Sequence, residues 1–168
     1  SAKFDQAPAA TGRTVRDVRR RGKYLLIGLE RQGSSARELV VHLGMTGRLA
    51  VSAHLDGSTL DHPHLRAWWA LDDDRVLTFH DTRRFGRIAV VDAGSYEGLP
   101  TLAALGPEPD DPAFTAEHLR SSINAGRRRV KTALLSQRPV AGVGNIYADE
   151  ALFAAGIDPS RAANSVPR

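Results

Sequence analysis

The segment Asp81-Thr82-Arg83-Arg84-Phe85-Gly86 places two guanidinium groups beside an aromatic ring in a short connection between two strand-like stretches. An aromatic side chain that enters a nucleic-acid duplex replaces lost base stacking, and an arginine can take the hydrogen-bonding place of a displaced base. Hairpin tips of ordinary proteins are often rich in arginine too, so this segment alone leaves both interpretations open.

A second segment able to bind an anion runs from residue 140 to 150, with the sequence VAGVGNIYADE. Gly142 and Gly144 end one helical connection, and Asn145 stands at the start of the next helix. The first N–H groups of a helix lack intrahelical acceptors and lie at the positive end of the helix dipole, so they can hold a phosphate. A helix hairpin with a tight glycine turn has the same spacing, and this alternative stays open as well.

Basic side chains gather in three clusters, and arginine supplies 20 of the 23 basic residues. The clusters are Arg13, Arg16, Arg19, Arg20, Arg21 and Lys23; Arg83, Arg84 and Arg87; and Arg127, Arg128, Arg129 and Lys131. Arginine binds phosphate bidentately, and a protein that neutralises nucleic-acid phosphates releases condensed counterions. Nucleic acid is therefore the expected partner, with solvated charged faces as the alternative.

The composition is that of a folded protein. With 42% hydrophobic and 25% charged residues among 168, the chain is long enough to bury a core and too apolar for disorder. No stretch approaches about 18 successive apolar residues, and the first residues lack a signal-peptide core, so we expect a cytoplasmic protein without a membrane span. Cysteine is absent, which excludes disulfides and thiolate zinc sites from this chain.

Hydrophobic periodicity divides the chain near residue 95 into two domains, 1–95 and 96–168. In the first, short apolar or alternating runs are separated by turn residues, which predicts antiparallel strands in a sandwich or barrel. Strands are expected at 14–18, 23–30, 38–43, 47–52, 65–71, 75–79 and 87–92. Helical spacing begins after the rigid connector Leu105-Gly106-Pro107-Glu108-Pro109, so we expect an α+β fold.

Three helices are expected in the second domain, over residues 115–124, 128–137 and 145–155. Thr115 is predicted to cap the start of the first helix, and Gly156 the end of the third. The expected inward face of the third helix consists of Ile146, Ala151, Leu152 and Phe153.

Five motifs, taken together and in chain order, resemble the formamidopyrimidine-DNA glycosylase and endonuclease VIII family. Within that family the resemblance is closer to the formamidopyrimidine-DNA glycosylase branch. The motifs are RGKYLL at 21–26, HLGMTG at 42–47, RRFG at 83–86, LGPEP at 105–109 and the segment 140–155. The resemblance implies a β-sandwich followed by a helix-two-turn-helix domain, with double-stranded DNA as the partner. It further implies base excision repair, with DNA glycosylase and AP lyase activity in the intact family.

The resemblance also implies roles for individual residues. Met45, Arg83 and Phe85 match the family residues that fill the space left by a flipped-out nucleotide. Lys23 matches a lysine beside the lesion phosphates, and His64 matches a phosphate-contacting histidine. We therefore expect these five side chains at the lesion.

The second domain supplies the expected contacts to the DNA backbone. Asn145 matches the asparagine with which the family clamps the backbone, and we expect Gly144, Arg128 and Lys131 to contact the backbone as well. No metal or cofactor is expected, because the family's zinc finger carries four cysteines and this chain has none.

The family's nucleophile is not found in this sequence. The family attacks the sugar carbon with the amine of an N-terminal proline while an adjacent glutamate moves protons, whereas this chain begins Ser1-Ala2-Lys3-Phe4. Three hypotheses stay open. In one the chain is a piece of a full repair enzyme, and in another it is a short, catalytically silent paralogue that binds DNA or serves as an interaction module. In a third, the amine of Ser1 or Lys23 acts at abasic sites.

An uncovered surface is a further expectation. The family sandwich includes strands from its N-terminal segment, so an edge or an apolar face should be exposed here and should favour self-association. As a bacterial-type repair protein, the chain would be associated with the nucleoid.

Overall fold

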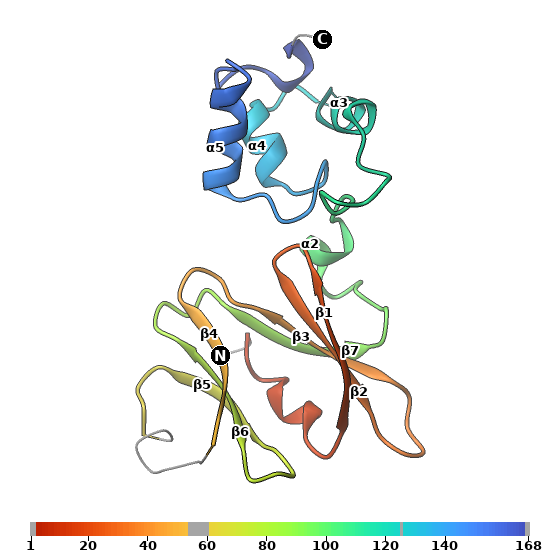
Figure 1. Ribbon diagram of the computed structural model, residues 1–168, viewed down its shortest axis with the longest axis vertical. Helices are drawn as coiled ribbons and strands as arrows, with labels where there is room; N and C mark the ends of the chain where they lie inside the picture. Colours follow the sequence, from red (N-terminus) through yellow and green to blue (C-terminus); the bar gives the residue numbers. More distant parts are fainter. Residues whose placement is uncertain (1–2, 54–60, 125, 167–168) are drawn as a thin grey trace. The chain divides into compact units, whose positions relative to one another are not determined.

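The structure is a computed structural model that describes residues 3–53, 61–124 and 126–166. The chain forms two compact units, Ser1–Ser95 and Tyr96–Arg168. Antiparallel strands make up most of the first unit and short helices the second (Figure 1). This arrangement confirms the expected α+β fold class.

Four antiparallel strands form one sheet, in the order β1-β2-β3-β7. They are β1 (Thr14–Arg21), β2 (Tyr24–Glu30), β3 (Arg37–His42) and β7 (Arg87–Asp92). β1 continues beyond its predicted end at residue 18, because its pairing with β2 extends to Arg21, next to the turn at Gly22. Gly22 has a φ of 54°, in the left-handed region that favours glycine.

Three antiparallel strands form the other sheet, in the order β4-β6-β5. They are β4 (Gly47–Ser52), β5 (Leu65–Ala70) and β6 (Val76–Asp81). Phe79 on β6 is fully buried and belongs to the core between the two sheets. The core between the sheets includes Ile27, Leu29, Leu39, Val41, Trp69, Phe79, Ile88 and Val90.

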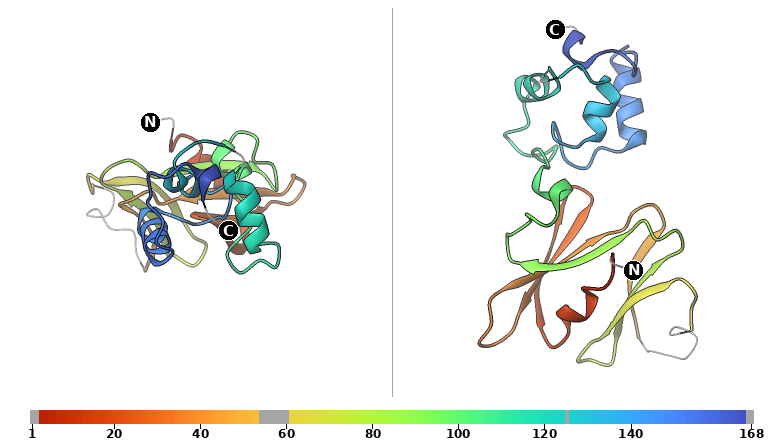
Figure 2. Two further views of the ribbon diagram at one scale, coloured as in Figure 1. Left: turned by 90° about the horizontal axis from the view of Figure 1, so that it is seen from above. Right: turned by 180° about the vertical axis from the view of Figure 1, so that it is seen from behind.

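The segment before β1 lies between the two sheets, where it forms the short helix η1 (Ala7–Ala10) (Figure 1 and the right-hand view of Figure 2). The indole Nε1 of Trp69 donates a hydrogen bond to the carbonyl oxygen of Ala7 at 2.9 Å. The backbone N–H of Val90 donates to Oε1 of Gln6 at 3.1 Å. These contacts join the segment to both sheets, and the sequence pattern did not predict this helix.

Part of the sandwich is open. Val15 and Val18 on β1 are 48% and 62% exposed. A cavity of about 600 Å³ lies between the sheets and η1, and its lining includes Phe4, Ile27 and Trp69. The uncovered apolar surface agrees with the expectation from the sequence, and self-association through it stays a prediction.

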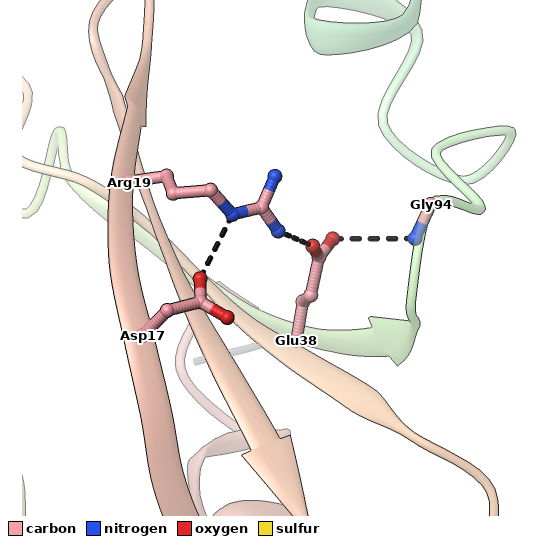
Figure 3. Close-up of polar contacts among 4 residues, drawn as sticks. All are labelled: Asp17, Arg19, Glu38 and Gly94. Atoms are coloured by element: carbon pink, nitrogen blue, oxygen red, sulfur yellow. Dashed lines mark hydrogen bonds and ion pairs between the residues drawn. The ribbon is translucent and has the colours of Figure 1, made fainter.

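A polar network fixes the exposed strand β1 to the rest of its sheet (Figure 3). Arg19 donates from Nε to Oδ1 of Asp17 at 2.8 Å and from Nη2 to Oε1 of Glu38 on β3. The buried Glu38 also accepts a hydrogen bond from the backbone N–H of Gly94, after β7, at 3.3 Å. The hydrogen bond to Asp17, and to a smaller extent the one to Glu38, raises the pKa of Arg19.

The helical unit contains α2 (Pro100–Ala103), α3 (Ala116–Asn124), α4 (Val130–Leu135), α5 (Asn145–Ala154) and η2 (Ala163–Ser165). Its small core consists of Ile123, Val130, Ala133, Leu152 and Ala163. Both predicted caps are confirmed: the hydroxyl of Thr115 accepts a hydrogen bond from the N–H of His118 at 3.0 Å, and Gly156 has a φ of 64°. None of the helices in the described part of the chain has the length and apolar character needed to cross a membrane.

The predicted inward face of α5 is wrong. Ile146 and Phe153 are 77% and 87% exposed, and Ala151 is exposed too. The buried residues are Ala148 and Leu152, which lie one turn apart on the side that packs against α4. This helix has apolar residues of its own on every side, so its sequence gives little indication of which side is buried.

Helix α4 is also shorter than the predicted range 128–137. Arg129 forms an isolated antiparallel bridge with Ala162, and the N–H of Val130 donates to the carbonyl oxygen of Arg161 at 2.8 Å. The backbone before Val130 is therefore extended and paired with the C-terminal segment.

Candidate nucleic-acid interface

Strand register brings three turns to one end of the four-stranded sheet. Tyr24 at the start of β2 pairs with His42 at the end of β3, and His42 pairs with Arg87 at the start of β7. The turn before β2 carries Lys23, the turn after β3 carries Met45, and the turn before β7 carries Arg83 and Phe85. Four of the residues singled out in the sequence therefore lie at the same end of the sandwich.

The three-stranded sheet adds His64 to this end. Gly47 at the start of β4 pairs with Asp81 at the end of β6, and Leu65 at the start of β5 pairs with His80. The carbonyl oxygen of His64 accepts a hydrogen bond from the N–H of Asp81 at 2.9 Å. His64 therefore lies immediately beside the turn that carries Arg83 and Phe85.

Lys23 lies close to a histidine that the sequence did not single out. Burial lowers the pKa of Lys23, and burial together with the charge of Lys23 lowers the pKa of His42. The backbone N–H of Gly44 donates to Nδ1 of His42 at 3.1 Å, so the neutral ring carries its proton on Nε2. The ring of Tyr24 packs against the same imidazole, with 4.8 Å between centroids. A cationic amine thus lies beside an imidazole that is held in one orientation.

The Met45 turn and the Phe85 turn pack against each other. A Cβ on Gly44 would lie 2.7 Å from the backbone carbon of Phe85 and 2.8 Å from the backbone nitrogen of Gly86. Gly44 has a φ of 65°, so both its conformation and its surroundings require glycine. This close backbone contact leaves the Met45 side chain 72% exposed.

Arg83 and Phe85 form a unit at the tip of the other turn. The guanidinium carbon of Arg83 lies 4.6 Å from the centroid of the Phe85 ring, which is a cation–π contact. Phe85 is 49% exposed, although its turn is connected to the buried end of β6. Two exposed apolar side chains, Met45 and Phe85, and one guanidinium thus lie on adjacent turns. Such a group can enter a stack of bases and donate hydrogen bonds there.

His64 belongs to a cluster of three imidazoles. The ring of His62 lies 5.5 Å from that of His64 and 4.8 Å from that of His80, measured between centroids. Burial lowers the pKa of His80, and the nearby His62, Arg48 and Arg66 lower it further. The cluster therefore adds imidazoles and guanidinium groups to the end of the sandwich that carries Lys23.

In the helical unit, Asn145 is the first residue of α5 and is exposed. The preceding Gly144 is in an extended conformation, and its carbonyl oxygen accepts the hydrogen bond from Ala148 at 2.9 Å. The connection before it is fixed by the buried Gln137, whose Oε1 accepts a hydrogen bond from the N–H of Gly142 at 3.0 Å. The start of α5 is therefore a pre-formed arrangement of backbone donors beside an exposed amide side chain.

The two basic residues predicted near this helix start have different surroundings. Nζ of Lys131 donates to Oδ2 of Asp149 at 2.9 Å, which ties α4 to α5. Arg128 is exposed, and its backbone oxygen accepts a hydrogen bond from Ala163 at 2.9 Å. Lys131 therefore already has an anionic partner within the protein, whereas the Arg128 side chain is directed to the surface.

Several site residues were missed at the level of sequence. The sequence motifs assign no separate role to His42, His62 or His80. Their signal was present, since His62 and His64 are two residues apart and His42 opens the HLGMTG motif. Within residues 3–53, 61–124 and 126–166, no three His, Asp or Glu side chains are arranged to hold a metal ion.

Comparison with known proteins identifies both halves of the chain. The formamidopyrimidine-DNA glycosylase N-terminal domain matches residues 1–88, and the H2TH domain of formamidopyrimidine-DNA glycosylase matches residues 105–168. The formamidopyrimidine-DNA glycosylase of Moorella thermoacetica is 52% identical over 156 residues, which are 92% of this chain and 54% of the relative. The chain thus spans little more than half the length of the curated relatives it matches.

Solved structures give the same result. The Fpg (MutM) protein of Thermus thermophilus superposes with a TM-score of 0.82 at 44% identity, covering 99% of this chain and 57% of that one. Lactococcus lactis Fpg in complex with DNA containing an abasic site superposes with a TM-score of 0.77 at 31% identity, covering 94% and 55%. Because the N-terminal family model alone matches more than half of the sequence, the chain belongs to the formamidopyrimidine-DNA glycosylase family.

Proposed function

We propose that the chain binds double-stranded DNA at abasic or oxidised sites, as part of base excision repair. The observation that carries the proposal is the gathering of exposed apolar side chains and cations at one end of the sandwich. Met45 and Phe85 would enter the duplex where a nucleotide has left the stack, and Arg83 would donate hydrogen bonds there. Lys23 and His64 would neutralise the adjacent phosphates.

The helical unit would bind the DNA backbone in a manner independent of sequence. Phosphate oxygens accept hydrogen bonds from helix N-termini and side-chain amides, which the start of α5 offers through Gly144 and Asn145. Arg128 and Lys131 would add charge. Contacts of this kind give affinity, whereas discrimination of the lesion would come from the side chains that enter the duplex.

The relatives support this assignment. Complexes of Lactococcus lactis Fpg contain DNA with an abasic site or with a Fapy-dG lesion, and these proteins are 31–32% identical to the chain. The named relatives are bacterial, and a chain that binds DNA as proposed would be associated with the bacterial nucleoid.

Strand cleavage is a second candidate function, and one observation favours it. Burial lowers the pKa of Lys23, which increases the neutral fraction of its amine. A neutral amine can add to the C1′ aldehyde of an abasic site and lose water to form an imine, and β-elimination of the 3′ phosphate can follow. DNA binding without catalysis, by a module that occupies lesions or contacts other repair proteins, is the corresponding alternative.

Two measurements on one abasic duplex test these proposals together. A gel shift reports binding, and borohydride reduction traps any imine as a covalent adduct. We expect a shift that weakens as salt rises, because counterion release contributes to affinity. If the chain shifts neither the abasic nor the undamaged duplex at low salt, the proposed DNA binding is wrong. A trapped adduct that disappears in Lys23→Met would establish the amine chemistry, and a shift without an adduct would rule it out.

Two variants separate the roles of the units. Asn145→Ala should weaken binding to abasic and undamaged duplexes alike and reduce the salt dependence. Phe85→Ala should mainly reduce the preference for the abasic duplex. If both variants affect both DNAs equally, the assignment of Phe85 to the lesion is wrong.

A further inference from the structure

Asp81 is the last residue of β6, and its side chain is fully buried. Its Oδ1 accepts a hydrogen bond from the hydroxyl of Thr46 at 2.5 Å, and its Oδ2 accepts one from the backbone N–H of Gly86 at 2.7 Å. Thr46 follows Met45, and Gly86 follows Phe85. One carboxyl group therefore binds both of the turns that carry the exposed apolar side chains.

The carboxyl group is ionised in spite of its burial. Burial by itself raises the pKa of Asp81, but the hydrogen bonds from Thr46 and from the backbone of Gly86, Arg83 and Arg84 lower it by more. The net effect is a pKa below the usual value, so the group carries a negative charge at neutral pH. The donors that replace its water are mainly backbone N–H groups of the turn that carries Arg83 and Phe85.

Thr46 joins the two turns a second time. While its hydroxyl donates to Asp81, its oxygen accepts a hydrogen bond from the backbone N–H of Arg83 at 3.2 Å. Arg84 has a φ of 56°, in the left-handed region that is unfavourable for residues other than glycine. Hydrogen bonds to Asp81 on both sides of Arg84 therefore hold the turn in a conformation that it would not favour alone.

The backbone of Asp81 extends these contacts to the histidine cluster. Its N–H donates to the carbonyl oxygen of His64, and its carbonyl oxygen accepts from Nε of Arg66 at 2.8 Å. Space around the carboxylate is limited, because a Cβ on Gly86 would lie 3.0 Å from Oδ2 of Asp81. Asp81 is thus bonded to the Met45 turn, to the Phe85 turn and to His64.

We propose that Asp81 and Thr46 are positioning residues, whose charge-assisted hydrogen bonds hold Met45, Arg83 and Phe85 in the fixed arrangement needed for entry into a damaged duplex. This inference rests on the proposed function, since it names the residues that organise that site. Neither residue needs to touch DNA. Their role is to keep two exposed turns from moving apart when no DNA is bound, which reduces the ordering cost of binding.

The test compares Asp81→Asn with the matched control Glu38→Gln. Glu38 is also a buried carboxylate of the same unit, but its partners are Arg19 and Gly94 (Figure 3). Both variants lose a buried charge, so both should lower stability. Only Asp81→Asn should reduce the ratio of affinities for abasic and undamaged duplexes, by about tenfold, the equivalent of one hydrogen bond to a charged group.

Thr46 provides a rescue that a general loss of stability would not show. Thr46→Val removes the hydroxyl at nearly constant volume and should lower the same ratio, whereas Thr46→Ser keeps the hydroxyl and should retain it. If Asp81→Asn fails to fold, this pair decides the question. A wild-type ratio in Thr46→Val, or equal losses in Asp81→Asn and Glu38→Gln, would overturn the proposal.

A measurement without DNA separates this inference from the proposed function. Hydrogen exchange at the Arg83 and Gly86 amides should be accelerated about tenfold in Asp81→Asn and unchanged in Glu38→Gln. If the wild-type chain binds no DNA, the proposed function fails, and the exchange rates still show whether Asp81 holds the turns. Unchanged exchange at both amides in Asp81→Asn would refute the positioning role.

Discussion

Replacement of Gly44 by alanine tests the contact between the Met45 and Phe85 turns. The control is Gly33→Ala, since Gly33 lies in another strand connection of the same unit with a φ of 71°, close to the 65° of Gly44. A Cβ on Gly33 would meet no atom within 4 Å, whereas a Cβ on Gly44 would lie 2.7 Å from the backbone of Phe85. The two variants therefore share the conformational penalty and differ in the clash.

The magnitudes follow from this difference. An alanine in the left-handed region costs about 1–2 kcal/mol, offset in part by the reduced entropy of the unfolded chain. We expect a net loss of about 1 kcal/mol for Gly33→Ala. Forcing an extra carbon against backbone atoms typically adds about 1–3 kcal/mol, so Gly44→Ala should lose about 2–4 kcal/mol in total.

Urea denaturation followed by tryptophan fluorescence measures these losses in the relevant unit, because both tryptophans, at positions 68 and 69, lie in the sheet unit. Gly44→Ala should also lower the preference for abasic over undamaged duplex in a gel shift, since the clash separates the two turns. Gly33→Ala should leave that preference unchanged. Equal losses of stability in the two variants would refute the reasoning, because the close contact would then cost nothing.

Two further predictions concern Lys131 and Asp81. Asp149→Asn should raise DNA affinity severalfold, because Asp149 competes with phosphate for Lys131 and an exposed ion pair of this kind contributes about 0.2–1 kcal/mol. The control Glu150→Gln removes the same charge from the same helix. An equal rise in affinity in both variants would show that only the net charge matters. The lowered pKa of Asp81 means that its stabilisation is complete above the unfolded value of about 4 and is lost as the pH falls through the lower folded value. Denaturation between pH 2.5 and 6 should therefore show a smaller loss of stability in Asp81→Asn than in wild type, and parallel curves would contradict the assignment.

Local patterns in the sequence determined much of the fold. Each of the seven predicted strands is present in the described part of the chain, where short apolar or alternating runs between turn residues predicted it, with ends that differ by a few residues. Two helix ends could also be predicted from the sequence, because the hydroxyl of Thr115 and the backbone freedom of Gly156 act within one turn of the chain. The motifs that indicated the family are local too, and the comparisons confirm that family.

Tertiary structure alone decided which side chains meet. Lys23 and His42 become neighbours through the register of β2 and β3, and an alternation pattern specifies the face of a strand rather than its neighbours. Packing against α4 decides which face of α5 is exposed, because α5 has apolar residues on every side. The role of Asp81 depends most on tertiary structure. In the sequence it resembles any aspartate before a turn. Only the packing of the distant Met45 turn against the turn that follows Asp81 makes its carboxylate a buried, charged centre.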